Sequence, residues 1–334
     1  MKSEDMILKA AIVHILDSSV GIPVLSDQSM EVGPDFSDFL KAHIEKITES
    51  DDVKHCTFAE GSEVKELLQN CTPDNFVETS KQLAERLYDI MNANIDIPAA
   101  DVAMTVFGCK GKDYLAFLKM NYKTSYTHQT RETDGGNSNE IILQRALLPG
   151  QGQRLSEAFV LDLSDGSLIL AEKKYEVNGE KCFYELFLEC RAPLSQKSKL
   201  DIVTRAVDQV AKKYYGNEDA QKKMEIKDII CNELEEQGEI KVSELREKVF
   251  PGSPEMLEEL DEKLDRYNLS YETVAPKNEQ TIKKFQKQKL YTDTGIEITI
   301  PMEEYRNPDH VEFITNMDGT ISVLIKNIGM LSSK

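Results

Sequence analysis

Apolar residues recur along the first part of the chain with two different periods, and this change of period separates predicted helices from predicted strands. Apolar positions three and four residues apart predict helices over 36–50 and 72–94. Thr72 is expected to cap the second helix, with Pro73 at its first position. A period of two, or a short continuous apolar run, predicts two strands within 6–26 and further strands over 100–109, 114–122, 155–163, 168–175 and 182–190.

Glycine-containing polar segments lie between these strands and have the composition of tight hairpin turns. They are Lys110-Gly111-Lys112, Asp165-Gly166 and Asn178-Gly179. A polar segment rich in glycine and asparagine at 133–139 is expected to be a loop. We therefore predict an α+β domain over residues 1–193, in which helices pack on a mostly antiparallel sheet.

A second domain, mostly helical, is predicted over residues 194–334, beginning after Pro193. Ser198 is expected to cap a helix that ends at Gly216, and further helices are predicted over 218–237, 243–250 and 254–266. Strands are predicted over 295–301, 311–316 and 320–326, the last two joined at Asp318-Gly319. This domain is therefore expected to end in a small antiparallel sheet.

The formal net charge is −19, which repels other polyanions at long range and argues against uniform coating of nucleic acid. A local basic patch remains compatible with this charge, because salt screens opposing charges beyond ~10 Å. The opening residues lack the pattern of a secretion signal, and no run approaches the ~20 apolar residues that span a bilayer. These features favour a cytoplasmic protein that does not enter the membrane.

The charge is unevenly distributed along the second domain. Residues 224–265 hold 14 acidic and 5 basic side chains, a net of −9 within one helical block. Residues 276–289 and the milder stretch 195–223 are basic, and clustered lysines neutralise phosphates, the main contribution to non-specific DNA affinity. The alternative is an ordinary solvated face. The candidate DNA contacts are Lys277, Lys283, Lys284, Lys287, Lys289, Lys212 and Lys213.

Signals for catalysis or for a bound cofactor are weak. Asp162 and Asp165 followed by Glu172 and Lys174 have the residue types of a Mg²⁺-dependent nuclease site, but Asp165-Gly166 already suits a hairpin turn. The helix over 254–266 occupies the position of a recognition helix, yet its acidic side chains would repel phosphate. The six cysteines form no C-x-x-C pair and no phosphate-binding loop motif is present. We expect no enzyme, no metal and no cofactor.

Several segments taken together resemble one known family. They are the opening 11–17 with 21–26, the hairpin strand 114–122, the segments 187–190 and 231–234, and the terminal region 295–328. They are similar to the bacterial nucleoid-associated proteins of the YejK/NdpA family, over nearly the whole chain. The resemblance implies a cytoplasmic protein found with the nucleoid, able to associate with DNA and not known as an enzyme. It supplies no DNA-contacting residues that can be transferred by position.

The leading hypothesis is a nucleoid-associated protein that binds DNA without strong sequence preference, mainly through residues 276–289 and also near Lys212 and Lys213. The alternative is an interaction module that reaches the nucleoid through a DNA-bound protein, which the acidic block 224–265 motivates. Assembly as a homodimer is expected only because it is the commonest oligomeric state.

Overall fold

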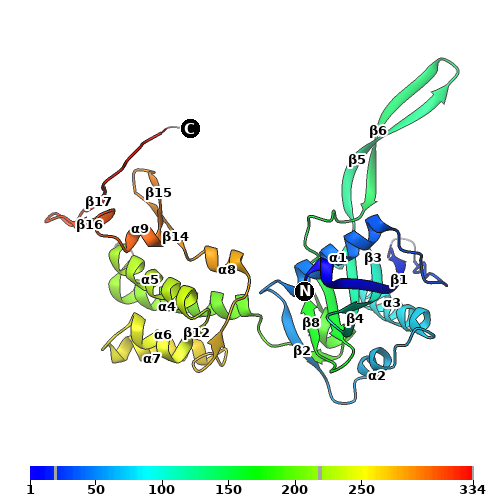
Figure 1. Cartoon of the computed structure of the whole chain (residues 1–334), viewed down its shortest axis with the longest axis horizontal. Coiled ribbons are helices and arrows are strands. Elements are labelled where there is room, and N and C mark those ends of the chain that lie inside the picture. Colours follow the sequence, from blue (N-terminus) through cyan, green and yellow to red (C-terminus); the bar gives the residue numbers. More distant parts are fainter. Residues whose placement is uncertain (19–20, 217–219, 333–334) are drawn as a thin grey trace. The chain divides into compact units, whose positions relative to one another are not determined.

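The structure is a computed structural model that describes residues 1–18, 21–216 and 220–332. The chain divides into two compact units, unit 1 over Met1–Ser195 and unit 2 over Gln196–Lys334, which are coloured from blue to green and from green to red (Figure 1). Unit 1 is built on an antiparallel sheet with packed helices, and unit 2 is mostly helical with small antiparallel ribbons. The predicted α+β class is therefore confirmed.

Unit 1 contains one seven-stranded sheet in which every neighbouring pair is antiparallel. The sheet order is β1 (Met6–Leu16), β3 (Ala100–Cys109), β4 (Lys112–Asn121), β7 (Glu157–Asp162), β8 (Leu168–Ala171), β2 (Lys54–Phe58) and β11 (Cys190–Arg191). All six residues of β7 are buried, because both faces of the sheet are covered by helices. Continuous apolar runs, rather than alternation, are the expected pattern for such central strands.

The two faces of the sheet support two separate hydrophobic cores. Helix α1 (Pro34–Thr48) packs Leu40, Ile44 and Ile47 against one face. Helices α2 (Glu63–Gln69) and α3 (Phe76–Asn92) cover the other face, around Phe117 and Phe159. Alternate residues of β3 enter different cores, since successive side chains of a strand point to opposite faces. Unit 1 is thus a three-layer arrangement with the sheet in the middle.

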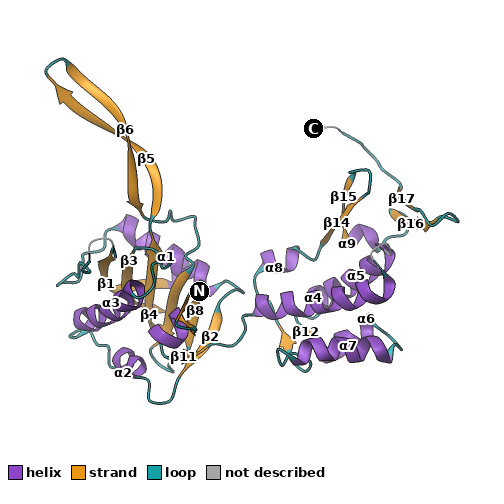
Figure 2. Cartoon of the chain, turned by 180° about the vertical axis from the view of Figure 1, so that it is seen from behind, coloured by secondary structure: helices purple, strands orange, loops and turns teal. Residues whose placement is uncertain are grey.

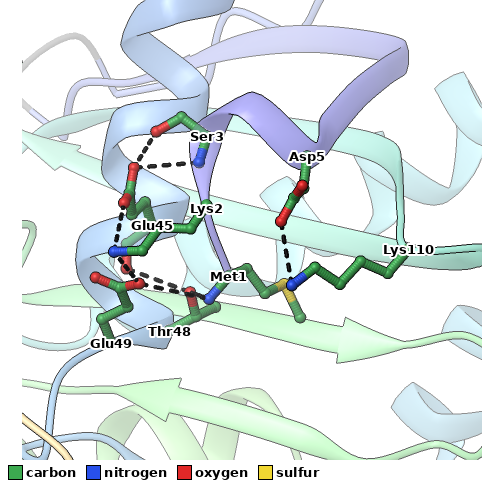
Figure 3. A network of polar contacts seen from close by, with 8 residues as sticks. All are labelled: Met1, Lys2, Ser3, Asp5, Glu45, Thr48, Glu49 and Lys110. Atoms are coloured by element: carbon green, nitrogen blue, oxygen red, sulfur yellow. Dashed lines mark hydrogen bonds and ion pairs between the residues drawn. The ribbon is translucent and has the colours of Figure 1, made fainter.

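Local contacts fix the edges of this arrangement. Lys110 (φ 50°) and Gly111 (φ 80°) both adopt left-handed backbone between β3 and β4, as a two-residue turn of the primed type requires. The first residues are held by polar contacts to α1, where the Lys2 ammonium lies 2.7 Å from Glu49 (Figure 3). Asp5 pairs with Lys110 at 3.2 Å, which links the short 3₁₀ turn η1 (Ser3–Asp5) to the β3–β4 turn.

Three predictions about unit 1 are wrong in detail. In place of the second strand expected within 6–26, the described residues contain an isolated β-bridge between Ile15 and Val24. Asn75, rather than Thr72, occupies the N-cap of α3, because residues 72–75 form a turn in which the Asn75 side chain accepts from the Thr72 amide. Residues 182–190 do not form a strand: the segment η2 (Cys182–Phe187) is a π-helical turn.

The π-helical turn is stabilised by tertiary contacts that a local pattern does not contain. Phe183 and Phe187 are buried in the core under α3. The Arg86 guanidinium donates to the carbonyls of Leu186 and Phe187 at 2.7 and 2.9 Å, and pairs with Glu189 at 2.6 Å. The adjacent turn at Asn178-Gly179 is as expected, and joins the two-residue strands β9 (Glu176–Val177) and β10 (Glu180–Lys181).

The largest departure from the sequence-based expectation is a long two-stranded ribbon that projects from unit 1 (Figures 1 and 2). It is made of β5 (Lys123–Thr133) and β6 (Gly136–Leu147), so the loop expected over 133–139 is mostly strand around a tight tip. All eleven residues of β5 are exposed. We call this ribbon the arm; at ~3.4 Å per residue it extends about 35 Å.

Unit 2 begins with four helices. They are α4 (Gln196–Tyr215), α5 (Ala220–Glu236), α6 (Val242–Val249) and α7 (Pro254–Asp265). A short ribbon of β12 (Ile240–Lys241) and β13 (Thr273–Val274) closes this group. Ser198 lies inside α4 instead of capping it, and residues 218 and 219 of the next predicted helix fall outside the described residues.

The last part of unit 2 packs on α5. It contains α8 (Glu279–Lys283), α9 (Met302–Tyr305) and two hairpins, β14 (Lys287–Tyr291) with β15 (Glu297–Pro301) and β16 (Val311–Thr315) with β17 (Ile321–Ile325). Their inner side chains form a small core with Met224 and Cys231 of α5. Within the part of the chain that is described, no helix combines the length and apolar character needed to cross a membrane.

Candidate nucleic-acid interface

The basic segment 276–289 folds into a short helix followed by an edge strand. Asn278 caps α8 by accepting from the Gln280 amide at 2.8 Å, and Phe285 is half-buried in the small core beside α5. The lysines between and after these anchors are exposed. Local structure therefore fixes the backbone of this segment while leaving its cationic side chains in solvent.

Strand β14 separates its polar and apolar side chains between two faces. Lys287, Lys289 and Tyr291 are exposed, whereas Gln288 and Leu290 are partly covered. In the antiparallel register Lys289 faces Thr299 and Tyr291 faces Glu297, and both partners are exposed as well. The period of two thus places two lysines and one aromatic ring, 69% exposed, on one open surface.

Three of the seven candidate lysines are paired with carboxylates. Lys283 lies 2.8 Å from Glu279, Lys289 lies 2.7 Å from Glu297, and Lys213 contacts Glu259. Hydrogen bonding to these carboxylates raises the pKa of Lys213 and of Lys289. Ion pairs at exposed positions are screened by solvent and contribute little to stability, so a phosphate can replace the carboxylate at little cost.

The remaining candidates differ in their surroundings. Lys212, Lys284 and Lys287 are exposed and have no acidic partner within the described ranges. Lys277 is exposed just before α8. Because an unpaired ammonium has no carboxylate to compete with phosphate, Lys212, Lys284 and Lys287 are the strongest candidates for direct contact.

The structure separates Lys212 from Lys213, although they are neighbours on α4. Lys212 lines a pocket together with Phe285 and Gln288, so it lies beside the basic segment. Lys213 instead reaches α7, where it pairs with Glu259. Lys212 therefore joins residues 276–289 in one candidate interface, and Lys213 lies on another part of the surface.

A further lysine, which sequence reasoning counted only within the acidic block, belongs to the same neighbourhood. Lys227 of α5 donates to the Lys287 carbonyl at 2.6 Å. Burial lowers the pKa of its ammonium, with Cys231 and Asp208 acting in the opposite direction. It lies within the acidic block 224–265, so its place beside β14 becomes visible only in the fold.

The acidic side chains of α7 form a surface of opposite character. Glu255, Glu258, Glu259 and Glu262 line an open depression of about 440 Å³, which the basic side chains of Lys213, Lys263 and Arg266 also border. Helix α7 is the helix that a helix-turn-helix reading would place against DNA. Its carboxylates would repel phosphate, which argues against base reading by this helix.

The alternative nuclease site is not assembled. Asp162 lies at the turn end of the β7–β8 hairpin, where it pairs with Lys112 at 2.7 Å. Glu172 follows the other end of β8 and pairs with Lys54. The four residues of β8 lie between these two positions, so five residue steps separate them, about 17 Å at ~3.4 Å per residue. Among the residues that are described, no group of three or more potential metal ligands is found.

Comparison with known proteins assigns the chain to a family. The family model described as nucleoid-associated protein YejK matches residues 12–330 of the 334-residue chain. The chain belongs to this family of nucleoid-associated proteins. A search of curated proteins found no match. The match spans both units, so the basic segment, the acidic helix α7 and the arm all lie within the family region.

For a member of the YejK family, the arm is the other obvious candidate for contact with DNA, but its charge does not favour this role. Between residues 123 and 147 three basic side chains balance three acidic ones, and Arg131 pairs with Glu140 at 3.4 Å. A ribbon without net charge gains little from counterion release. The basic segment with Lys212 therefore remains the better candidate.

Proposed function

We propose that this protein binds DNA without strong sequence preference and without catalysing a reaction on it. The contact surface is the basic segment 276–289 together with Lys212. The observation that carries the proposal is the gathering of Lys212, Lys284 and Lys287, which lack acidic partners among the described residues, in one small region of a chain with a net charge of −19. Membership of a nucleoid-associated family supports it.

The mode of binding follows from the side chains available. Ammonium groups on flexible stems act as point charges that neutralise phosphates and do not select a base. Tyr291, on the same face of β14 as Lys287 and Lys289, offers a ring on which an unpaired base can stack. The footprint is small, because the surrounding acidic surface repels the rest of the duplex.

Charge reversal tests this surface. The double variant Lys284→Glu/Lys287→Glu is expected to lower affinity for a duplex oligonucleotide at least tenfold and to make the salt slope shallower by about 2. The control Lys65→Glu/Lys174→Glu changes the net charge by the same −4 at exposed positions of unit 1. Equal affinities for the two variants in a fluorescence-anisotropy titration would show that another surface binds the DNA.

A second candidate function is attachment to the nucleoid through a basic protein that is itself bound to DNA. The acidic side chains of α7, six against one lysine, favour it, since complementary charge steers such an association. In this case Glu255→Lys/Glu258→Lys should reduce co-sedimentation with isolated nucleoids while leaving binding to purified DNA unchanged. Loss of binding to purified DNA in the basic-segment variant, with normal nucleoid association, would identify both contacts as real and separate.

A further inference from the structure

Unit 2 contains a pocket that the proposed DNA contact does not require. It has a volume of about 400 Å³ and lies among α4, α5 and the segment that leads into β14. Pockets of 300–1,000 Å³ are typical for ligands of small-molecule size. One part of its wall is apolar, formed by Ala211, Ile226, Ile230 and Phe285.

The polar part of the wall is cationic. Lys212, Lys223 and Lys227 line it, against one carboxylate, Asp208, which interacts electrostatically with Lys223 and Lys227. The local sum is three positive charges and one negative, a net of +2 in a protein with a net charge of −19. Clustered like charges that fold against an apolar wall favour an anionic occupant, which lowers their mutual repulsion.

Hydrogen-bonding capacity is also available at this wall. Lys227 uses one of its three N–H donors on the Lys287 carbonyl, so two remain. The Thr204 hydroxyl donates to carbonyls of its own helix, at 2.9 Å for Leu200, and its oxygen retains acceptor capacity. A bare inorganic anion would satisfy the lysines and leave the apolar wall unused, whereas an uncharged apolar ligand would bury the ammonium groups without a partner.

We propose that this pocket binds one nucleotide unit, with its phosphate on Lys212 and Lys227 and its base against Ile226, Ile230 and Phe285. Two sources share this chemistry: a free mononucleotide, and the phosphorylated end of a nucleic-acid strand. The proposal does not rest on duplex binding by the basic segment, since Lys212 is the only lysine that both proposed phosphate contacts use, although Phe285 and Gln288 of that segment also line the pocket.

The test uses the full-length chain and adenosine 5′-monophosphate as the probe, with inorganic phosphate and adenosine as comparison ligands. Isothermal titration is expected to show the monophosphate binding at least tenfold more tightly than either fragment. Lys227→Met should weaken binding about tenfold or more, the loss expected for a hydrogen bond to a charged group. Lys222→Met is the matched control, since Lys222 is an exposed lysine of the same helix that pairs with Glu225 outside the pocket.

Lys212→Met is a second variant, and it should fold normally because the Lys212 side chain is exposed. Thermal unfolding shows whether Lys227→Met is still folded. A 5′-phosphorylated single-stranded oligonucleotide that displaces the monophosphate identifies a strand end as the ligand; failure to displace it identifies the free nucleotide. Absence of monophosphate binding, or equal binding by Lys227→Met, Lys212→Met and the control, would overturn the proposal. Duplex affinity, measured separately with Lys284→Glu/Lys287→Glu, tests the proposed function independently of this result.

Discussion

A buried ion pair in the sheet of unit 1 allows the sharpest prediction about stability. Lys119 of β4 and Glu157 of β7 face each other directly across the antiparallel ladder, and neither side chain is exposed to solvent. The ammonium lies 3.1 Å from both carboxylate oxygens. Asn121 completes the network, since its amide oxygen accepts from Lys119 and its amide nitrogen donates to Glu157, both at 2.5 Å.

The substitution Lys119→Met removes the cation and leaves the Glu157 carboxylate buried, with the Asn121 amide still donating to it. Breaking a buried pair in this way costs about 3–5 kcal/mol, because the surviving charge is desolvated without compensation. For a unit of this size the loss corresponds to a fall of roughly 6–20 °C in the midpoint of thermal unfolding. Burial already lowers the pKa of Lys119, while the Glu157 charge opposes that shift.

The double variant Lys119→Met/Glu157→Leu removes both charges and keeps a similar side-chain volume. Its free energy of unfolding should match that of the wild-type protein within about 1 kcal/mol, or exceed it, because neither charge has to be desolvated. Circular dichroism with urea titration measures both variants, and the twelve tyrosines provide a fluorescence signal in a chain without tryptophan. A double variant as unstable as the single one would refute the reasoning that an uncompensated charge causes the loss.

Two further predictions concern the arm and the response to acid. Replacing residues 126–143 by Asn-Gly joins Ser125 and Gln144, which are paired across the ribbon. Because the arm lies outside the hydrophobic cores, the midpoint of thermal unfolding of unit 1 should stay unchanged within about 2 °C. A much larger fall of this midpoint in differential scanning calorimetry would contradict the prediction. Burial lowers the pKa of His14 and of His43 from 6.5 to about 4, so on acidification the unfolded chain binds protons before the folded chain does. The free energy of unfolding should therefore fall as the pH decreases from 6.5 towards 4. Equal urea midpoints at pH 7 and pH 5 would contradict this prediction.

Elements whose local signals were complete could be predicted from sequence. The β3–β4 hairpin combines two apolar runs with a turn that accepts left-handed backbone at Lys110 and Gly111, and helix α1 has a complete apolar stripe. Residues 182–190 also have a strand-like pattern, yet Arg86 binds three groups of this segment and stabilises a π-helical turn. The contact that decides the structure there comes from about a hundred residues earlier in the chain, which no local pattern contains.

The strands of the arm were not predicted from the sequence, because their local pattern is not typical of strands. Its strands belong to neither core, so they lack a continuous apolar face, and the glycines at its tip favour a loop assignment. The β-branched residues Thr124, Thr127, Thr130 and Thr133 were the available signal, because threonine is enriched in strands. Tyr126 and Ile141, each 72% exposed, lie on the same face of the ribbon.

The candidate interface was predicted only in part. Local charge identifies the lysines of 276–289, because they are adjacent in sequence. The packing of α4 and α5 decides the rest. It places Lys212 beside these lysines, directs Lys213 towards α7, and brings Lys227 next to β14. Residues separated by 60 positions or more meet at this site, so only the fold brings them together.

The salt dependence of DNA binding by the purified wild-type protein tests the central claim most directly. About four lysine–phosphate contacts, from Lys212, Lys284, Lys287 and Lys289, predict a log–log slope near −3.6, at ~0.9 for each contact. Affinity for a mixed-sequence duplex should therefore fall about 150-fold between 50 and 200 mM salt, with little dependence on base sequence. No binding at 50 mM salt, or an affinity that does not change with salt, would contradict direct DNA binding by this surface.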